Sequence, residues 1–170
     1  MGGKRGETLV PFSLGVGSGA KGRYKTKMEV LTLTEFLLQN THGSHFYMKT
    51  PSGHDIHVDT DPEFLGYDSA AKPLEYLIAG LGGCTGIDVV TILNKMKVKY
   101  DALNLRILTE RSEEHPKKYT KIHIIYEFKG KDLPMDRLQR AAQLSQEKYC
   151  GATATFRGST EITYEVKIVE

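Results

Sequence analysis

The chain has 170 residues, of which 39% are hydrophobic and 26% are charged, and its formal net charge is +2. These values are typical of one globular domain that is long enough to bury a core. The 23 basic residues form no long run, which argues against nucleic acid or a membrane surface as the main partner. The uncharged stretch at residues 76–87 is shorter than the roughly 20 residues of a membrane span.

The cysteine content and the N-terminus both bear on the cellular compartment. Only two cysteines are present, and no compact apolar run followed by a small-residue cleavage site appears near the N-terminus. A secreted domain stapled by disulfides is therefore disfavoured. We predict a cytoplasmic protein, in whose reducing surroundings a cysteine pair is more often reactive or incidental than structural.

Residues 1–25 differ in composition from the rest of the chain. Seven of them are glycine, and the apolar residues among them have no sustained period. We predict a flexible leader over residues 1–25 and a single domain over residues 26–170. The glycines of the leader lack the preceding strand that a phosphate-binding loop requires, so nucleotide binding is not expected.

Three short strands are predicted before residue 60. Residues 28–38 are rich in Val, Leu, Thr and Phe, and residues 45–49 and 56–59 alternate between apolar and polar side chains. The sequence Thr-Pro-Ser-Gly at residues 50–53 is typical of a type I turn. The pattern predicts three antiparallel strands with one buried face.

A long apolar helix is predicted over residues 72–98. Pro73 suits its first turn, and the first three turns are apolar nearly all round, which indicates burial on every side. Each glycine between residues 80 and 86 costs about 1 kcal/mol relative to alanine in a helix interior. We expect the close approach of another backbone, such as a second helix, to offset that cost. One small domain can hardly surround a rod of roughly 37 Å, so the pattern predicts an obligate homodimer.

Further strands and a second helix follow in the rest of the chain. Apolar and polar residues alternate over residues 103–107, 122–128 and 162–168, which predicts three strands. A helix is predicted from Pro134 to Cys150, with Gly151 in the usual C-terminal position. The order is therefore β-β-β-α-β-β-α-β, an α+β fold with an antiparallel sheet and two long central helices.

The two cysteines are the candidate reactive groups. Cys84 lies in the apolar helix among small residues that leave room for a substrate or a second sulfur. Asp88, one turn further along roughly the same face, disfavours a thiolate there unless it is itself paired. Cys150 is expected at a helix C-terminus, where the helix dipole disfavours a thiolate. This asymmetry suggests that Cys84 attacks and Cys150 resolves, although two cysteines so far apart are more often buried and inert.

Two runs of the sequence resemble those of a known family. Residues 73–90, which contain Gly-Gly-Cys-Thr-Gly-Ile-Asp, resemble the central helix of the OsmC/Ohr proteins, the osmotically inducible and organic-hydroperoxide-resistance proteins. Residues 144–150, Leu-Ser-Gln-Glu-Lys-Tyr-Cys, resemble the second cysteine motif of that family. A glycine-bearing loop at residues 61–67 also sits where related sequences carry one. The resemblance covers about residues 28–170.

The resemblance implies an OsmC-like fold, an intertwined homodimer with active sites at the subunit interface, and a two-cysteine peroxidase. In such a peroxidase the thiolate of Cys84 takes an oxygen from an organic hydroperoxide, and Cys150 condenses with the resulting sulfenic acid to a disulfide. A dithiol reductant, of the lipoyl type in related proteins, then restores both thiols by exchange. No bound cofactor is implied.

The chain departs from the family pattern in two respects. Better-known members carry a catalytic glutamate ten residues before the first cysteine, where this chain has Leu74, with Glu75 one place later. In a regular helix Glu75 points about 180° away from Cys84. It would then act in the site of a partner subunit or bind an arginine, or else be only a solvated acidic residue near the helix N-terminus. We keep Glu75 as a candidate catalytic residue. The activating arginine of the family has two candidates, Arg23 and Arg157.

Two histidine pairs, His42 with His45 and His54 with His57, invite a metal-site interpretation. On a strand, a three-residue offset points side chains to opposite faces, and no cysteine is nearby in the sequence. Exposed polar positions explain these residues better, and no metal site is predicted.

Two functions remain open at the level of the sequence. The first is the peroxidase, with apolar hydroperoxides favoured because Tyr76, Leu77, Leu81, Ile87 and Tyr149 would wall the site. The alternative is a dimer without peroxidase activity that binds a small apolar or electrophilic ligand and keeps its cysteines for packing. Sulfurs close enough for a disulfide near an arginine favour the first, and sulfurs held apart in sealed apolar surroundings favour the second.

Overall fold

The structure, a computed structural model, describes residues 34–170, and the predicted leader at residues 1–25 lies outside this part. Its strands are β1 (Gln39–His42), β2 (His45–Lys49), β3 (Asp55–Val58), β4 (Ala102–Arg111), β5 (Tyr119–Lys129) and β6 (Glu161–Ile168). Its helices are η1 (Pro62–Phe64), α1 (Pro73–Lys95), α2 (Met135–Leu144), η2 (Ser145–Tyr149) and α3 (Gly151–Phe156). This element order confirms the predicted α+β class.

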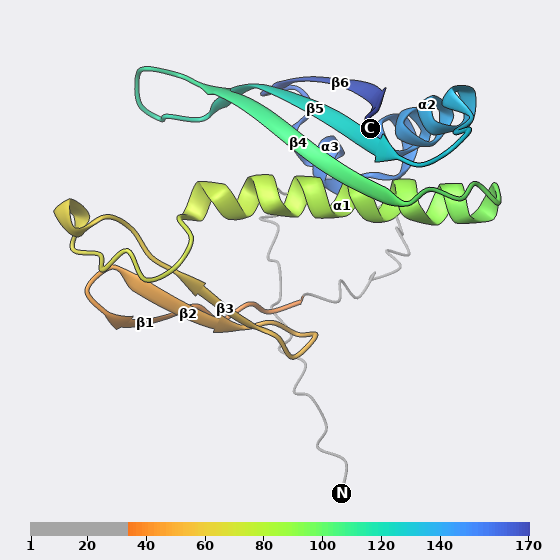
Figure 1. Cartoon of the computed structure of the whole chain (residues 1–170). Coiled ribbons are helices and arrows are strands. Elements are labelled where there is room, and N and C mark those ends of the chain that lie inside the picture. Colours follow the sequence, from red (N-terminus) through yellow and green to blue (C-terminus); the bar gives the residue numbers. More distant parts are fainter. Residues whose placement is uncertain (1–33) are drawn as a thin grey trace, which may run out of the picture.

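The first sheet is antiparallel, in the order β1-β2-β3, and Figure 1 shows it below α1. Its first strand begins later than predicted, because residues 34–38 form no strand; residues 28–33 lie outside the described part. The turn at Gly43, whose φ is +50°, pairs His42 with His45 and so sets the register of the hairpin. The prediction that this sheet has one buried face is also wrong within this chain, because the side of β2 that carries Phe46 remains open and Phe46 is 38% exposed.

α1 confirms the predicted long helix. Leu81, Val89 and Leu93 are fully buried at helical spacing and belong to the hydrophobic core. On the other side of the helix Ile87 is 69% exposed, so this chain alone does not bury the helix on every side, and its burial by a partner subunit stays a prediction. By length and composition alone α1 meets the criteria for a membrane span, which the core helix of a globular protein also meets.

The glycines of α1 have unlike surroundings. A Cβ on Gly82 would lie 2.9 Å from Cδ1 of Ile107 on β4, so this glycine lets the helix approach the strand closely. The neighbour is therefore a strand side chain and not the second helix that the sequence suggested. Gly80 and Gly83 have no atom of the described residues within 4 Å of such a Cβ.

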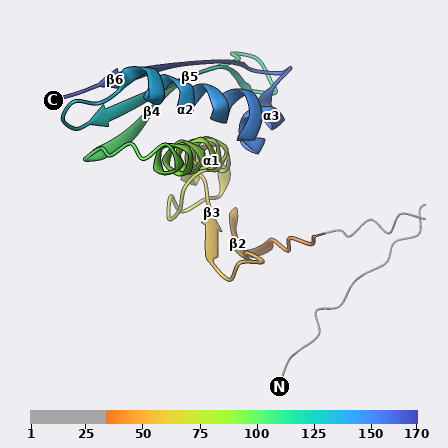
Figure 2. The same cartoon turned by 90° about the vertical axis from the view of Figure 1, so that its right-hand side faces the viewer.

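The second sheet has the order β4-β5-β6, and α1 and α2 pack against the same side of it (Figures 1 and 2). β4 and β5 are antiparallel, whereas β6 runs parallel to β5, a detail that the predicted antiparallel sheet did not include. The predicted alternation on β5 is confirmed, because Ile122, Ile124, Tyr126 and Phe128 are all buried.

The second helical region is divided into three segments. α2 ends at Leu144, a turn of π-helix follows, and α3 begins at Gly151. The amide of Cys150 donates to the carbonyl of Ser145 at 2.8 Å, which is the wide turn of the π-helix. Gly151 is thus the first residue of a new helix and not the C-terminal glycine of the predicted one.

Candidate active site

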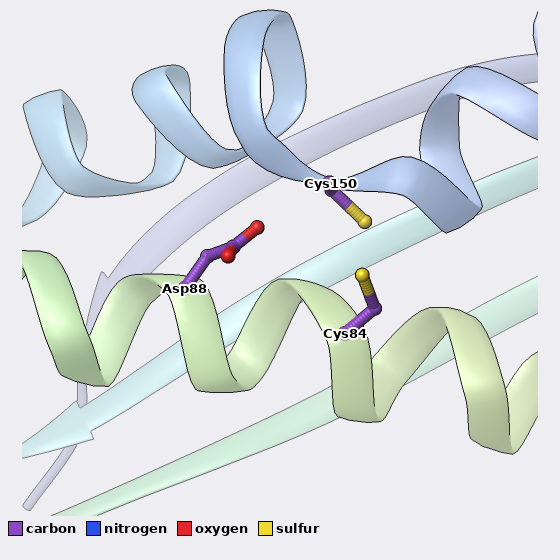
Figure 3. A group of neighbouring side chains, drawn as sticks. All are labelled: Cys84, Asp88 and Cys150. Atoms are coloured by element: carbon purple, nitrogen blue, oxygen red, sulfur yellow. The ribbon is translucent and has the colours of Figure 1, made fainter.

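Cys84 and Cys150 meet in space although 66 positions separate them in the sequence. α1 carries Cys84, and Cys150 lies at the junction between η2 and α3 (Figure 3). The two sulfurs and a carboxylate oxygen of Asp88 all lie within 4.8 Å of one another. Both cysteines are free thiols, and Figure 3 shows their sulfurs pointing toward each other.

The two thiols differ in their exposure to solvent. Cys84 is half-buried, whereas Cys150 is only 4% exposed. Burial raises the pKa of the Cys150 thiol, hydrogen bonds from Thr153 lower it, and the nearby Cys84 raises it again, with a net increase. Cys150 is therefore held as a neutral thiol, and Cys84 is the more accessible sulfur.

The local backbone around Cys150 corrects the argument from the helix dipole. Cys150 does not simply end a helix, because it is also the N-cap of α3. The backbone amide of Thr153 donates to Sγ of Cys150 at 3.3 Å. This contact stabilises negative charge on the sulfur, which is the opposite of the effect expected at a helix C-terminus.

A buried network of hydroxyl groups leads to Asp88. Oγ1 of Thr85 lies 2.5 Å from the hydroxyl of Tyr126 and 2.8 Å from Oγ of Ser145. Ser145 donates to Oδ2 of Asp88 at 3.0 Å. The side-chain amide of Gln146 donates to Thr85 at 3.0 Å and to Tyr126 at 2.8 Å.

The direction of every bond in this network follows from counting protons, because each hydroxyl has one to give. Ser145 gives its proton to Asp88, so Thr85 must donate to Ser145. The proton of Thr85 is then in use, so Tyr126 donates to Thr85. The result is a directed chain from Tyr126 through Thr85 and Ser145 to the carboxylate. Burial raises the pKa of Tyr126, which keeps its hydroxyl protonated as the first donor.

The sequence singled out neither Thr85 nor Ser145 nor Tyr126 as a site residue. A signal was present, since Thr85 and Ser145 are polar residues at core positions of predicted helices. Which partners satisfy them depends on the packing of three elements, which no local pattern shows.

Glu75 lies in the first turn of α1, nine residues before Cys84 in the middle of the helix. Its Oε2 accepts from the backbone amide of Lys72 at 2.9 Å, which caps the first turn of α1. Within this chain the structure does not bring Glu75 to Cys84, and its catalytic role remains a prediction.

The candidate arginines do not reach the sulfurs within the described residues. Arg157 donates to the backbone carbonyl of Gln146 at 2.9 Å, and Arg23 lies outside the described part. The ion pairs of residues 34–170 do not include Asp88 either. Within the described part of the chain, the cysteine pair thus has a carboxylate beside it, and no cationic side chain forms an ion pair with Asp88 or a hydrogen bond with either sulfur.

The residues expected to wall the site are distributed over several environments. Leu81 belongs to the core, and Tyr76 donates to the carbonyl of His57 on β3. Leu77, Ile87 and Tyr149 are exposed by about half or more. Two surface hollows of about 370 and 660 Å³ lie over the second sheet and between α2 and β6, and neither is lined by a cysteine.

Metal ligation has one candidate donor set among the described residues, namely the two sulfurs and Asp88. Thiolates and a carboxylate suit zinc, although three ligands leave the fourth tetrahedral position to another group.

The histidines are arranged differently from the prediction. The ring centroids of His42 and His45 lie 4.9 Å apart in a stacked arrangement. His45 is buried, and its Nε2 lies 3.3 Å from Nδ1 of His57. The rule of opposite faces fails because the hairpin turn places these histidines on paired strands.

Comparisons with known proteins agree on one family. The sequence model described as OsmC-like protein matches residues 66–165. Protein YhfA of Escherichia coli (strain K12) is 33% identical over 127 residues, which is 75% of this chain and 92% of that protein. The crystal structure of a hypothetical protein from Aquifex aeolicus VF5 has 32% identity and a TM-score of 0.68, and the match covers 82% of this chain and 100% of that chain.

A more distant structural match is the organic hydroperoxide resistance protein OhrB of Bacillus subtilis. Its TM-score is 0.54 at 15% identity, and the match covers 78% of this chain and 96% of that chain. At this level of identity the likeness concerns the fold alone.

Proposed function

This chain belongs to the family of OsmC-like proteins, and we propose that it reduces organic hydroperoxides through a disulfide between Cys84 and Cys150. The observation that carries the proposal is the meeting of two free sulfurs within 4.8 Å, from elements far apart in the sequence. Structures with the same fold include proteins named for organic hydroperoxide resistance, which supports this reaction class over other thiol chemistry.

The difference in exposure supports distinct roles for the two sulfurs. The accessible Cys84 attacks the hydroperoxide, so that the O–O bond breaks, a sulfenic acid forms on Cys84 and the alcohol leaves. Cys150, buried and held as a thiol, then attacks the sulfur of Cys84, and water leaves as the S–S bond forms. One hydroperoxide is reduced to one alcohol and one water for each disulfide made.

A homodimer is part of the proposal. The exposed side of α1 carries Gly83, Ile87 and Val90, and no described residue covers it. A second copy packed along this stripe would offset the cost of the glycines and close the apolar side of the cysteine pair. In such a dimer Glu75 would serve the partner's site.

The oxidised protein needs a reductant for turnover. We assign this part to an external dithiol, of the lipoyl type that the family resemblance implies, acting in the cytoplasm. A dithiol suits the task because its second thiol attacks the mixed disulfide, which closes a ring in the reductant and frees the protein thiol. No bound cofactor is required, because oxidation of the two thiols to a disulfide supplies the two electrons that reduce the hydroperoxide.

Single-cysteine variants and turnover test this function. With dihydrolipoamide as reductant, we expect the wild-type protein to consume cumene hydroperoxide faster than hydrogen peroxide. Cys84→Ser should abolish consumption, whereas Cys150→Ser should make one fast turnover and accumulate oxidised Cys84. Turnover that survives in Cys84→Ser would contradict the proposed roles.

The alternative function, a ligand-binding dimer without peroxidase activity, would be favoured by sulfurs held apart. Their proximity favours the disulfide reaction, whereas the arginine expected beside them is not found among the described residues. The alternative predicts that both thiols survive many equivalents of cumene hydroperoxide.

A further inference from the structure

We propose that Asp88 is a catalytic residue of this site, which takes the proton from each thiol as it reacts and returns it to the leaving oxygen. This inference rests on the proposed function and deepens it. It accounts for a site in which a carboxylate lies beside the sulfurs and forms no ion pair within the described residues.

The position of Asp88 meets the geometric requirement for proton transfer. One turn of α1 separates it from Cys84, and one of its oxygens lies within 4.8 Å of both sulfurs (Figure 3). Ser145 holds its Oδ2 at 3.0 Å, which fixes the orientation of the carboxylate. A water molecule, or a small movement as the substrate binds, closes the remaining distance.

The groups that face Asp88 come from three elements. Cys84 and Thr85 lie on α1, Ser145 on η2 and Cys150 at the start of α3, with Tyr126 of β5 behind them. The hydroxyl chain that ends on Asp88 donates toward it at every step. The carboxylate of Asp88 thus has its hydrogen-bond donor from this chain of hydroxyl groups and not from a cationic side chain.

Charge conservation explains why a base fits this site better than a preformed thiolate. Ionising Cys84 by loss of its proton to water would place a second negative charge beside Asp88 in partly buried surroundings. Passing the proton from Cys84 to Asp88 leaves one negative charge in the site throughout. The carboxylate thus opposes a resting thiolate but assists the reacting thiol.

Both chemical steps balance with Asp88 in this role. In the first, Asp88 accepts the proton of the Cys84 thiol as its sulfur attacks the hydroperoxide, and the departing alkoxide takes that proton to become the alcohol. In the second, Asp88 accepts the proton of Cys150 as its sulfur attacks the sulfenic acid, and the departing hydroxide takes it to become water. The carboxylate is regenerated each time.

The test compares wild-type protein with Asp88→Asn in two reactions of the reduced thiols. Asparagine keeps the size of the side chain and an oxygen that accepts from Ser145, but it takes up no proton. With cumene hydroperoxide at pH 7, we expect disulfide formation to slow by about 10²-fold, at the low end of general acid–base effects. The deficit should shrink as the pH rises and the thiols ionise without help.

Alkylation by iodoacetamide provides the second reaction, because its leaving iodide needs no proton. We expect Asp88→Asn to slow alkylation less than disulfide formation, because alkylation needs no proton returned to a leaving oxygen and removal of a negative neighbour favours the thiolate. The loss of rate should therefore be larger with cumene hydroperoxide than with iodoacetamide. Asp136→Asn, the same substitution at an exposed position on α2, should alter neither.

Each other outcome has a distinct meaning. If Asp88→Asn forms the disulfide as fast as the wild type or faster, Asp88 only repels the thiolate, and this proposal is overturned while the proposed function stands. If both reactions slow by the same factor, Asp88 returns no proton to the leaving oxygen and the proposal is again overturned. If the wild type itself forms no disulfide, the proposed function fails and this inference fails with it.

Discussion

Asp59 follows β3 as a buried carboxylate and holds the loop that leads to α1. It accepts hydrogen bonds from the amide and hydroxyl of Ser69, at 3.0 and 2.7 Å, and from the amides of Thr60 and Tyr67. The Ser69 hydroxyl is the first of the groups that hold the pKa of this carboxyl well below its ordinary value. The ionised form of Asp59 is therefore tied to the folded loop.

This depression of the pKa predicts how the stability of the fold depends on pH. A carboxyl whose pKa is lower in the folded state than in the unfolded state stabilises the fold at any pH above the unfolded-state pKa of about 4. That contribution is lost as the pH falls from the unfolded-state pKa toward the folded-state pKa. We expect Asp59→Asn to be less stable at pH 7 and to lose less stability than the wild type between pH 5 and pH 3. Urea unfolding at several pH values measures both effects. An unchanged pH dependence in Asp59→Asn, relative to the Asp136→Asn control, would contradict this assignment.

Thr85 is the central member of the buried hydroxyl network. Thr85→Val keeps the shape of the side chain but removes one hydrogen-bond partner each from Tyr126, Ser145 and Gln146, and it leaves the hydroxyl proton of Tyr126 without its acceptor. We expect a loss of about 1–3 kcal/mol in the free energy of unfolding, the usual cost of unsatisfied buried polar groups. Tyr126→Phe removes only the outer hydroxyl, so its loss should be smaller in the same urea titration. Equal stability of Thr85→Val and wild type would show that the network does not hold the core.

At the scale of elements, α1 has one side in the core and one side open. The open stripe contains Gly83 and Ile87, and a Cβ on Gly83 would meet no described atom within 4 Å. A leucine at this position fits a single chain without strain, and glycine is the less favourable residue in a helix. We therefore propose this stripe as a surface that another molecule approaches.

Gly83→Leu tests whether that molecule is a second copy of the chain. We expect the variant to dissociate to monomers at concentrations where the wild type is dimeric, because a leucine side chain holds the two helices apart. Lys95→Leu adds the same apolar group at the end of α1 and should leave the dimer intact. Sedimentation velocity distinguishes the two states. A Gly83→Leu dimer as tight as the wild-type dimer would remove α1 from the proposed interface.

Elements with a strong local period could be predicted from the sequence. The alternation around Ile124 and the apolar run ending near Lys95 gave β5 and α1 within a few residues. These features depend on contacts within one strand or helix turn.

What the sequence could not give depends on longer-range packing. The π-turn before Cys150 forms because the network around Ser145 fixes that segment against α1, and no local pattern reports it. The start of β1 was missed because the turn at Gly43, and not the apolar segment before it, sets the pairing. The proposed role of Asp88 likewise depends on packing between α1 and η2, which brings Ser145 to its carboxylate.

On the scale of the whole molecule, α1 separates two unlike halves, as the end-on view in Figure 2 shows. The second sheet with α2 and α3 lies on one side and holds the core, and the first sheet lies on the other. The cysteine pair joins α1 to the junction of η2 and α3, so a disulfide there would link two elements that already pack together. Oxidation and reduction therefore need little rearrangement of the fold.

The most direct test of the account is the fate of the two thiols when the fully reduced full-length protein meets one equivalent of cumene hydroperoxide. Quenched samples are followed by intact mass, and the product is digested and mapped without reduction. We predict rapid loss of two hydrogens and a single cross-linked peptide pair containing Cys84 and Cys150. Thiols that persist in excess hydroperoxide, or oxidation that stops at one cysteine in the wild-type protein, would contradict it.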